Sequence, residues 1–173
     1  MLVTGGVRSG KSTHAETLMA GAAEVVYVAP GPSPDVEGDP DWAARVALHR
    51  SRRPASWRTV EGTDVASALG GAGAVMVDCL GTWVTSVIDE ESAWERSSDD
   101  LHALVQARLD VVLAAAASHP GRIVWVTNEV GMGLVPEHRS GRIFRDLLGT
   151  VNQRVAASSE AVHLVVAGRV LEL

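Results

Sequence analysis

Short apolar runs alternate with segments of helical spacing along the 173 residues of the chain. The runs that predict strands cover residues 2–4, 24–29, 57–60, 74–78, 123–127 and 162–167. Several are apolar at consecutive positions, which is typical of strands buried on both faces of a parallel sheet. The segments that predict helices cover residues 12–21, 42–52, 64–69, 82–88, 101–117 and 137–158. This alternation predicts a single α/β domain over residues 1–173, with a mostly parallel sheet and helices on both faces.

A glycine-rich segment joins the first predicted strand to the first predicted helix. It reads Gly5-Gly6-Val7-Arg8-Ser9-Gly10-Lys11-Ser12, a full match to the phosphate-loop pattern G-x-x-x-x-G-K-[ST]. Backbone amides of such a loop bind phosphate, the lysine reaches the β- and γ-phosphates, and the hydroxyl of Ser12 suits Mg²⁺. Lys11 is the one lysine beside fourteen arginines, and a compact ammonium suits this loop better than a planar guanidinium. The segment predicts nucleoside triphosphate binding and a P-loop NTPase-like fold.

Composition excludes some classes of binding partner and indicates the cellular compartment. A net charge of −6 argues against broad binding of nucleic acid or anionic membranes. The single cysteine, Cys79, excludes an intramolecular disulfide and a cysteine-based zinc site. The phosphate loop begins at residue 5, which leaves no room for an N-terminal signal, and we expect no apolar run of membrane-spanning length. These features predict a cytoplasmic protein.

Two further predicted strands end in side chains that suit a phosphate-binding site. Asp78 closes the run 74–78, where phosphate-loop enzymes place a carboxylate that organises Mg²⁺. Asn128 and Glu129 follow the run 123–127 in the same way, and ligands of parallel sheets lie beyond the carboxyl ends of the strands. Asp78 is therefore a candidate metal ligand, and Asn128-Glu129 a second candidate for contact with metal, water or substrate.

His49 stands beside a group of arginines, Arg50, Arg52 and Arg53. A neutral imidazole could attack the α-phosphorus of a nucleotide, while the guanidinium groups stabilise the departing pyrophosphate. The alternative is a solvated basic helix end with a half-buried histidine. From composition alone the alternative is favoured, because most isolated histidines are not catalytic.

The whole chain resembles the bifunctional adenosylcobinamide kinase / adenosylcobinamide-phosphate guanylyltransferases of cobalamin assembly. The resemblance rests on Thr4-Gly5-Gly6-x-Arg8-Ser9-Gly10-Lys11-Ser12, His14-Ala15-Glu16, Ala44-Arg45-Val46-x-x-His49-Arg50, Arg53-Pro54-x-x-Trp57, Asp78-Cys79-Leu80, Val126 to Glu137, Arg145-Asp146 and Val151-Asn152-Gln153-Arg154. It implies phosphorylation of the aminopropanol hydroxyl of adenosylcobinamide from ATP or GTP. It also implies transfer of GMP from GTP to the resulting phosphate through a guanylyl-histidine. The resemblance thus favours a nucleophilic His49 over a half-buried histidine at a solvated helix end.

By motif, the resemblance implies the following roles. The catalytic residues are His49 and Lys11, and Mg²⁺ is held by Ser12 and Asp78. The nucleotide-binding residues are Gly5, Gly6, Val7, Arg8, Ser9, Gly10, Lys11, Ser12, Arg50, Ser51, Arg52, Arg53, Glu61 and Asp78. The resemblance also implies a corrinoid substrate and a homotrimer. The Pro- and Gly-rich loop at residues 30–40 departs from the pattern of many relatives.

Two alternative functions remain open at this point. One is a phosphate-loop kinase that transfers only the γ-phosphoryl group, with a structural His49. The other is a GTP-binding switch without catalysis. A covalent GMP adduct separates the bifunctional enzyme from both. The residues that select guanine and bind the corrinoid are not indicated by any motif, although residues 131–137 and 30–40 are candidate walls of the corrinoid site.

Overall fold

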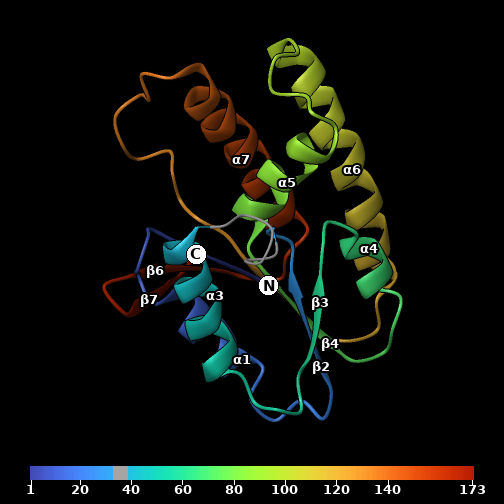
Figure 1. Ribbon diagram of the computed structural model, residues 1–173. Helices are drawn as coiled ribbons and strands as arrows, with labels where there is room; N and C mark the ends of the chain where they lie inside the picture. The colour runs from blue at the N-terminus through green and yellow to red at the C-terminus, as the bar shows by residue number, and fades with distance from the viewer. Residues whose placement is uncertain (33–38) are drawn as a thin grey trace.

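A computed structural model describes residues 1–32 and 39–173, and part of the predicted loop at 30–40 lies outside the described residues. Seven strands form one sheet in the order β3-β2-β4-β5-β1-β6-β7 (Figure 1). Their bounds are β1 (Leu2–Gly5), β2 (Val25–Ala29), β3 (Arg58–Glu61), β4 (Ala74–Asp78), β5 (Ile123–Val126), β6 (Val162–Val166) and β7 (Arg169–Glu172). All neighbouring strands pair in parallel except β6 and β7, which are antiparallel.

Helices cover both faces of the sheet (Figure 1). Their bounds are α1 (Lys11–Leu18), α3 (Pro40–Arg52), α4 (Val65–Ala68), α5 (Leu80–Glu90), α6 (Ser98–Ser118) and α7 (Arg139–Ala157). Helices α4 to α7 pack on one face, where Val26 and Val28 of β2 join the larger apolar cluster. Val25 and Tyr27 of the same strand face the other way, toward α1. Successive residues of β2 are thus buried on opposite faces, which explains its continuous apolar run.

The predicted α/β class with a mostly parallel sheet and helices on both faces is confirmed. One strand was missed: β7, a short edge strand whose four residues are all exposed. It is joined to β6 by a two-residue turn in which Ala167 and Gly168 both have positive φ, 50° and 75°. Such turns close antiparallel hairpins, so the Ala-Gly pair was the available signal.

Several predicted helix bounds also differ from the structure. Helix α5 runs from Leu80 to Glu90 and is two residues longer at each end than the predicted helix 82–88. Helix α1 ends at Leu18 instead of residue 21, and α7 begins at Arg139 instead of residue 137. The spacing of apolar residues predicts these bounds poorly, because the capping groups and the packing at each helix end determine where the helix begins and ends.

Helix α6 corrects the expectation about apolar length, because its 21 residues are long and apolar enough to cross a membrane by length and composition. A core helix can meet the same criterion. In this fold α6 packs through Leu101, Val105, Leu109 and Val112 into the larger apolar cluster. It also carries Arg108, which pairs with Glu90 of α5 at 3.0 Å.

Candidate active site

The phosphate loop connects β1 to α1 at the carboxyl end of the sheet. Gly10 caps α1 with a φ of 97°, a left-handed conformation that favours glycine. A side chain at Gly5 would collide with the carbonyl oxygen of Val165 in β6. Within the described chain no side chain caps the start of α1, so its first-turn amides can bind an anion, and the helix dipole favours negative charge there.

Lys11 is the first residue of α1 and is half-buried. Its Nζ donates a hydrogen bond to the carbonyl oxygen of Gly6 at 3.3 Å. Burial lowers the pKa of Lys11, with the opposing attraction of Cys79 and Asp78 coming second. A phosphate group bound at the loop would place a negative charge beside this ammonium and so compensate for the hydration that burial removes.

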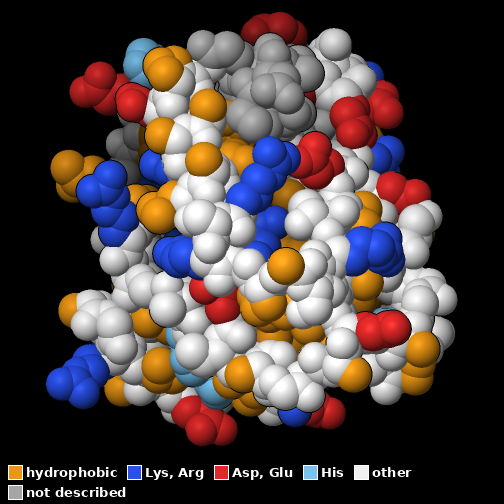
Figure 2. Space-filling view, turned by 60° about the horizontal axis from the view of Figure 1, so that its bottom comes forward, with side chains coloured by type: hydrophobic (Ala, Val, Ile, Leu, Met, Phe, Trp, Pro, Cys, Tyr) orange, Lys and Arg blue, Asp and Glu red, His pale blue; other side chains and the backbone are white. Residues whose placement is uncertain are grey.

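A cleft of about 930 Å³ opens beside the loop. Among the described residues, five cations line it: Arg8, Lys11, Arg45, Arg52 and Arg53. Within the same described part of the chain they outnumber the lining carboxylates, Asp41, Glu61 and Asp78. Figure 2 shows Lys and Arg side chains gathered in the middle of one face of the molecule. In a chain of net charge −6, such a local excess of positive charge points to an anionic ligand.

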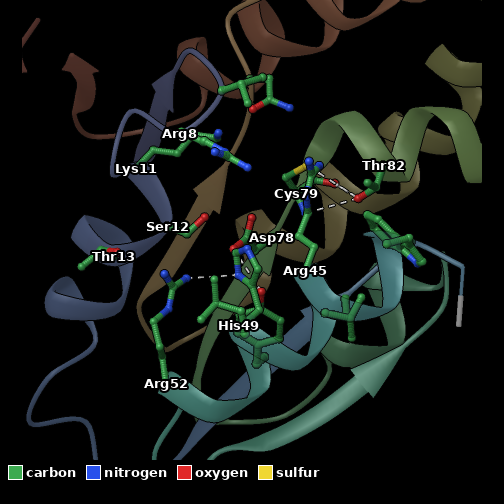
Figure 3. A pocket seen from close by; sticks show the side chains of 18 of the residues that line it. Arg8, Lys11, Ser12, Thr13, Arg45, His49, Arg52, Asp78, Cys79 and Thr82 are labelled. Carbon is green, nitrogen blue, oxygen red and sulfur yellow. Dashed lines mark hydrogen bonds and ion pairs between the residues drawn. The ribbon is translucent and has the colours of Figure 1, made fainter. Parts of the chain in front are cut away.

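His49 enters this cleft from α3 (Figure 3). Its Nδ1 lies 3.4 Å from Nη2 of Arg52 and 3.7 Å from Oδ2 of Asp78. Burial lowers the pKa of His49; Asp78 opposes this change, and nearby arginines add to it. The imidazole is therefore neutral near pH 7, which is the form that can act as a nucleophile.

Helix α3 has no buried residue and is held on the sheet by polar contacts. Arg53 donates to the carbonyl oxygen of His49 at 3.1 Å and to Oγ1 of Thr59 at 3.0 Å. Its guanidinium also lies over the ring of Tyr27, 3.5 Å from the centroid. Arg52 pairs with Glu16 of α1 at 3.4 Å. Because these partners belong to α1, β2 and β3, the position of His49 depends on several separate elements.

Asp78 closes β4 and faces the loop across the cleft. Its Oδ2 accepts a hydrogen bond from the hydroxyl of Tyr27 at 3.0 Å. Ser12 and Asp78 both line the cleft. One hydroxyl and one carboxylate fit a Mg²⁺ ion, which normally takes few protein ligands and completes its shell with phosphates and water. Among the described residues, no group of three His, Cys, Asp or Glu side chains could hold a metal by itself.

Most of the nucleotide-binding residues expected from the sequence come together here. Val7 to Ser12, Arg52, Arg53, Glu61 and Asp78 line the cleft, whereas Gly5, Gly6, Arg50 and Ser51 are not among its lining residues. Arg50 is ion-paired with Glu61, and Oγ of Ser51 donates to the carbonyl oxygen of Leu48 at 3.0 Å. Asn128 also lines the cleft, but Glu129 does not; Glu129 accepts a hydrogen bond from the amide of Gly131 at 2.7 Å.

Some lining residues were missed from the sequence, among them Tyr27, Arg45, Trp42 and Thr82. Tyr27 sits inside an apolar strand, where a tyrosine is usually a packing residue. Its hydroxyl was the only available signal, since a buried hydroxyl needs a polar partner. Arg45 lies one helical turn before His49 on α3, so the shared face could have been inferred from the spacing.

The fold and the cleft define a phosphate-loop enzyme that binds nucleotides. The chain matches the model of the CobU family, described as cobinamide kinase / cobinamide phosphate guanyltransferase, over residues 1–173. It is 40% identical over 179 residues to the bifunctional adenosylcobalamin biosynthesis protein CobU of Salmonella typhimurium, covering 97% of this chain and 96% of that protein. The protein of the same name from Escherichia coli shows the same identity and coverage. The bifunctional adenosylcobalamin biosynthesis protein CobP of Pseudomonas aeruginosa is 36% identical over 173 residues, covering 96% of this chain and 92% of that protein. The chain therefore belongs to the cobinamide kinase / cobinamide phosphate guanyltransferase family.

Proposed function

We propose that this chain, acting as a single domain, phosphorylates the aminopropanol hydroxyl of adenosylcobinamide and then transfers GMP to the product. ATP or GTP donates the phosphoryl group, and GTP donates GMP. The observation that carries the proposal is that His49 and the phosphate loop line one cleft. A nucleotide bound there would have a γ-phosphate for the first reaction and an α-phosphorus for the second.

In the kinase reaction the substrate hydroxyl attacks the γ-phosphorus, and the bond to the β-phosphate oxygen breaks. Phosphoryl transfer requires positioning and charge stabilisation more than covalent help from the protein. Lys11 and the amides at the start of α1 would place the β- and γ-phosphates. Arg8 lines the same part of the cleft and would add positive charge.

In the guanylyl transfer an imidazole nitrogen of His49 attacks the α-phosphorus of GTP. An N–P bond forms, the bond to the β-phosphate oxygen breaks, and pyrophosphate leaves. The corrinoid phosphate then takes the GMP and restores the free histidine. Arg52 and Arg53 flank His49 within the cleft and would stabilise the departing charge. Arg50 and Ser51 remain proposed nucleotide contacts, although they are not among the residues that line the cleft.

We further propose Mg²⁺ as the metal, with Ser12 and Asp78 as its protein ligands. When bound, it would neutralise charge on the phosphates in both reactions. A cytoplasmic homotrimer is also proposed from the family resemblance. Val166, Val170, Leu171 and Leu173 of the β6–β7 hairpin and the C-terminus are exposed, which supports an interface there. Sedimentation equilibrium of the full chain tests the trimer.

The test of the function is labelling with GTP that carries ³²P at the α-position, in Mg²⁺ and without corrinoid. Wild type should acquire a covalent label that survives alkali and is lost in acid, and His49→Ala should acquire none. His102→Ala, on α6 and outside the cleft lining, is the matched control and should label like wild type. If wild type is unlabelled but consumes γ-phosphate with corrinoid, the chain is a kinase only. If it binds GTP and does neither, it is a switch.

A further inference from the structure

One buried side chain contacts both the carboxylate that faces His49 and the arginine that docks the helix carrying His49. Tyr27 lies in the middle of β2 and is 2% exposed. Its hydroxyl donates to Oδ2 of Asp78 at 3.0 Å. The face of its ring supports the guanidinium of Arg53, 3.5 Å from the centroid. Tyr27 itself is not one of the expected nucleotide-binding residues, although its two partners, Asp78 and Arg53, are.

The sheet register explains how one tyrosine reaches both partners. Tyr27 pairs with Met76 on β4 and with Thr59 on β3. Asp78 is two residues beyond Met76, so its side chain lies on the same face, diagonally across from Tyr27 and within reach of an aromatic ring. Thr59, on the other side, accepts a hydrogen bond from Arg53 at 3.0 Å. The ring thus lies between the carboxylate of β4 and Arg53, which follows α3 and is hydrogen-bonded to Thr59 of β3.

The orientation of Asp78 matters because Nδ1 of His49 has two competing neighbours. Nη2 of Arg52, at 3.4 Å, is a donor and favours the tautomer with the proton on Nε2. Oδ2 of Asp78, at 3.7 Å, is an acceptor and favours the tautomer with the proton on Nδ1. Only the second tautomer leaves the lone pair of Nε2 free to attack phosphorus. The hydroxyl of Tyr27 binds the same oxygen of Asp78 and so holds the carboxylate toward Nδ1.

We propose that Tyr27 is a positioning residue for the nucleophile. Its hydroxyl holds Asp78 so that His49 carries its proton on Nδ1 and receives GMP on Nε2, and its ring seats Arg53 so that α3 stays docked. This inference rests on the proposed guanylyl transfer. The proton on Nδ1 stays within reach of Asp78 as the N–P bond forms, and the positive charge that develops on the ring faces that carboxylate.

Tyr27→Phe tests the hydroxyl and retains the ring under Arg53. The histidines are labelled with ¹⁵N, and His49 is assigned by comparison with His49→Ala. Long-range ¹H–¹⁵N correlation near pH 8 (about 1.5 units above the usual histidine pKa) then reports the tautomer of the neutral ring. We expect the Nδ1–H form to predominate in wild type and the Nε2–H fraction to rise in Tyr27→Phe. The first-order rate of guanylyl-enzyme formation should fall about tenfold or more, since tenfold is the lower end of the effect of losing one hydrogen bond to a charged group. The GTP concentration for half-maximal rate should stay within about threefold.

Met76→Leu is the matched control, since it alters packing beside Tyr27 without touching the hydroxyl, and should keep the wild-type tautomer ratio. An unchanged ratio in Tyr27→Phe would overturn the proposal, whatever the labelling rate. A GMP adduct found on Nδ1 in wild type would also overturn it. If wild type forms no adduct, the proposed guanylyl transfer fails, and the tautomer comparison still decides whether Tyr27 positions His49.

Discussion

Replacing Lys11 with alanine removes the ammonium that the phosphate loop supplies. The group is half-buried, so its attraction to a phosphate is screened less than at an open surface. At about 4 Å and an effective dielectric constant of about 20, one unit charge contributes about 4 kcal/mol. Since about 1.4 kcal/mol corresponds to a factor of ten, kcat/KM should fall roughly a thousandfold. Both reactions should lose activity, because both need the triphosphate in the same place.

The assays are γ-phosphoryl transfer to adenosylcobinamide and formation of the guanylyl-enzyme, each at sub-saturating nucleotide. Stability should change little, because within the described chain the Nζ makes one hydrogen bond, to the carbonyl oxygen of Gly6. Urea unfolding of Lys11→Ala should therefore lie within about 1 kcal/mol of wild type. Lys11→Arg keeps the charge and should not restore activity, because the planar guanidinium does not fit the loop. Loss below tenfold in either reaction, or rescue by arginine, would refute the reasoning about a shared nucleotide site.

Two further predictions concern pH and stability. Burial lowers the pKa of His49, so its neutral form persists to lower pH; the rate of guanylyl-enzyme formation should fall on the acid side with a midpoint below about 6.5. A pH–rate profile with a midpoint well above that value would contradict a buried, neutral nucleophile. Trp83 is 1% exposed and donates from Nε1 to the carbonyl oxygen of Thr63 at 3.1 Å. Trp83→Phe should lower the free energy of unfolding by about 2 kcal/mol, because it leaves that buried acceptor unpaired and removes volume. Urea denaturation measures the loss, and a change below about 0.5 kcal/mol would contradict the packing argument.

The central strands were predictable because each is a short run of consecutive apolar residues, a pattern that indicates burial on both faces. Residues 74–78 are apolar on both faces, and the predicted strand coincides with β4. The edge strand β7 was not, because its four exposed residues carry no buried pattern. The antiparallel hairpin that contains it closes at one turn, Ala167-Gly168, and this pair was a weak signal because alanine rarely adopts a positive φ.

The candidate site was predictable in part. The phosphate loop is contiguous, so Gly5 to Ser12 could be identified from spacing and chemistry alone. His49 with its arginines could be located as a cluster, but its role depended on the family resemblance. Tyr27 could be suspected only from its hydroxyl within an apolar strand, because its two contacts, with Asp78 and Arg53, join residues of β4 and the end of α3.

The sequence by itself determined the local chemistry: an anion-binding loop at the start of a helix, a carboxylate at a strand end, a histidine among arginines, and the family that combines them. Tertiary structure alone decided which of these side chains share a cleft and which neighbours face Nδ1 of His49. The physical reason is range. Backbone geometry and burial patterns act over a few residues, whereas the pairing of β2 with β3 and β4 brings Tyr27, Thr59 and Asp78 onto one face from positions far apart in the chain.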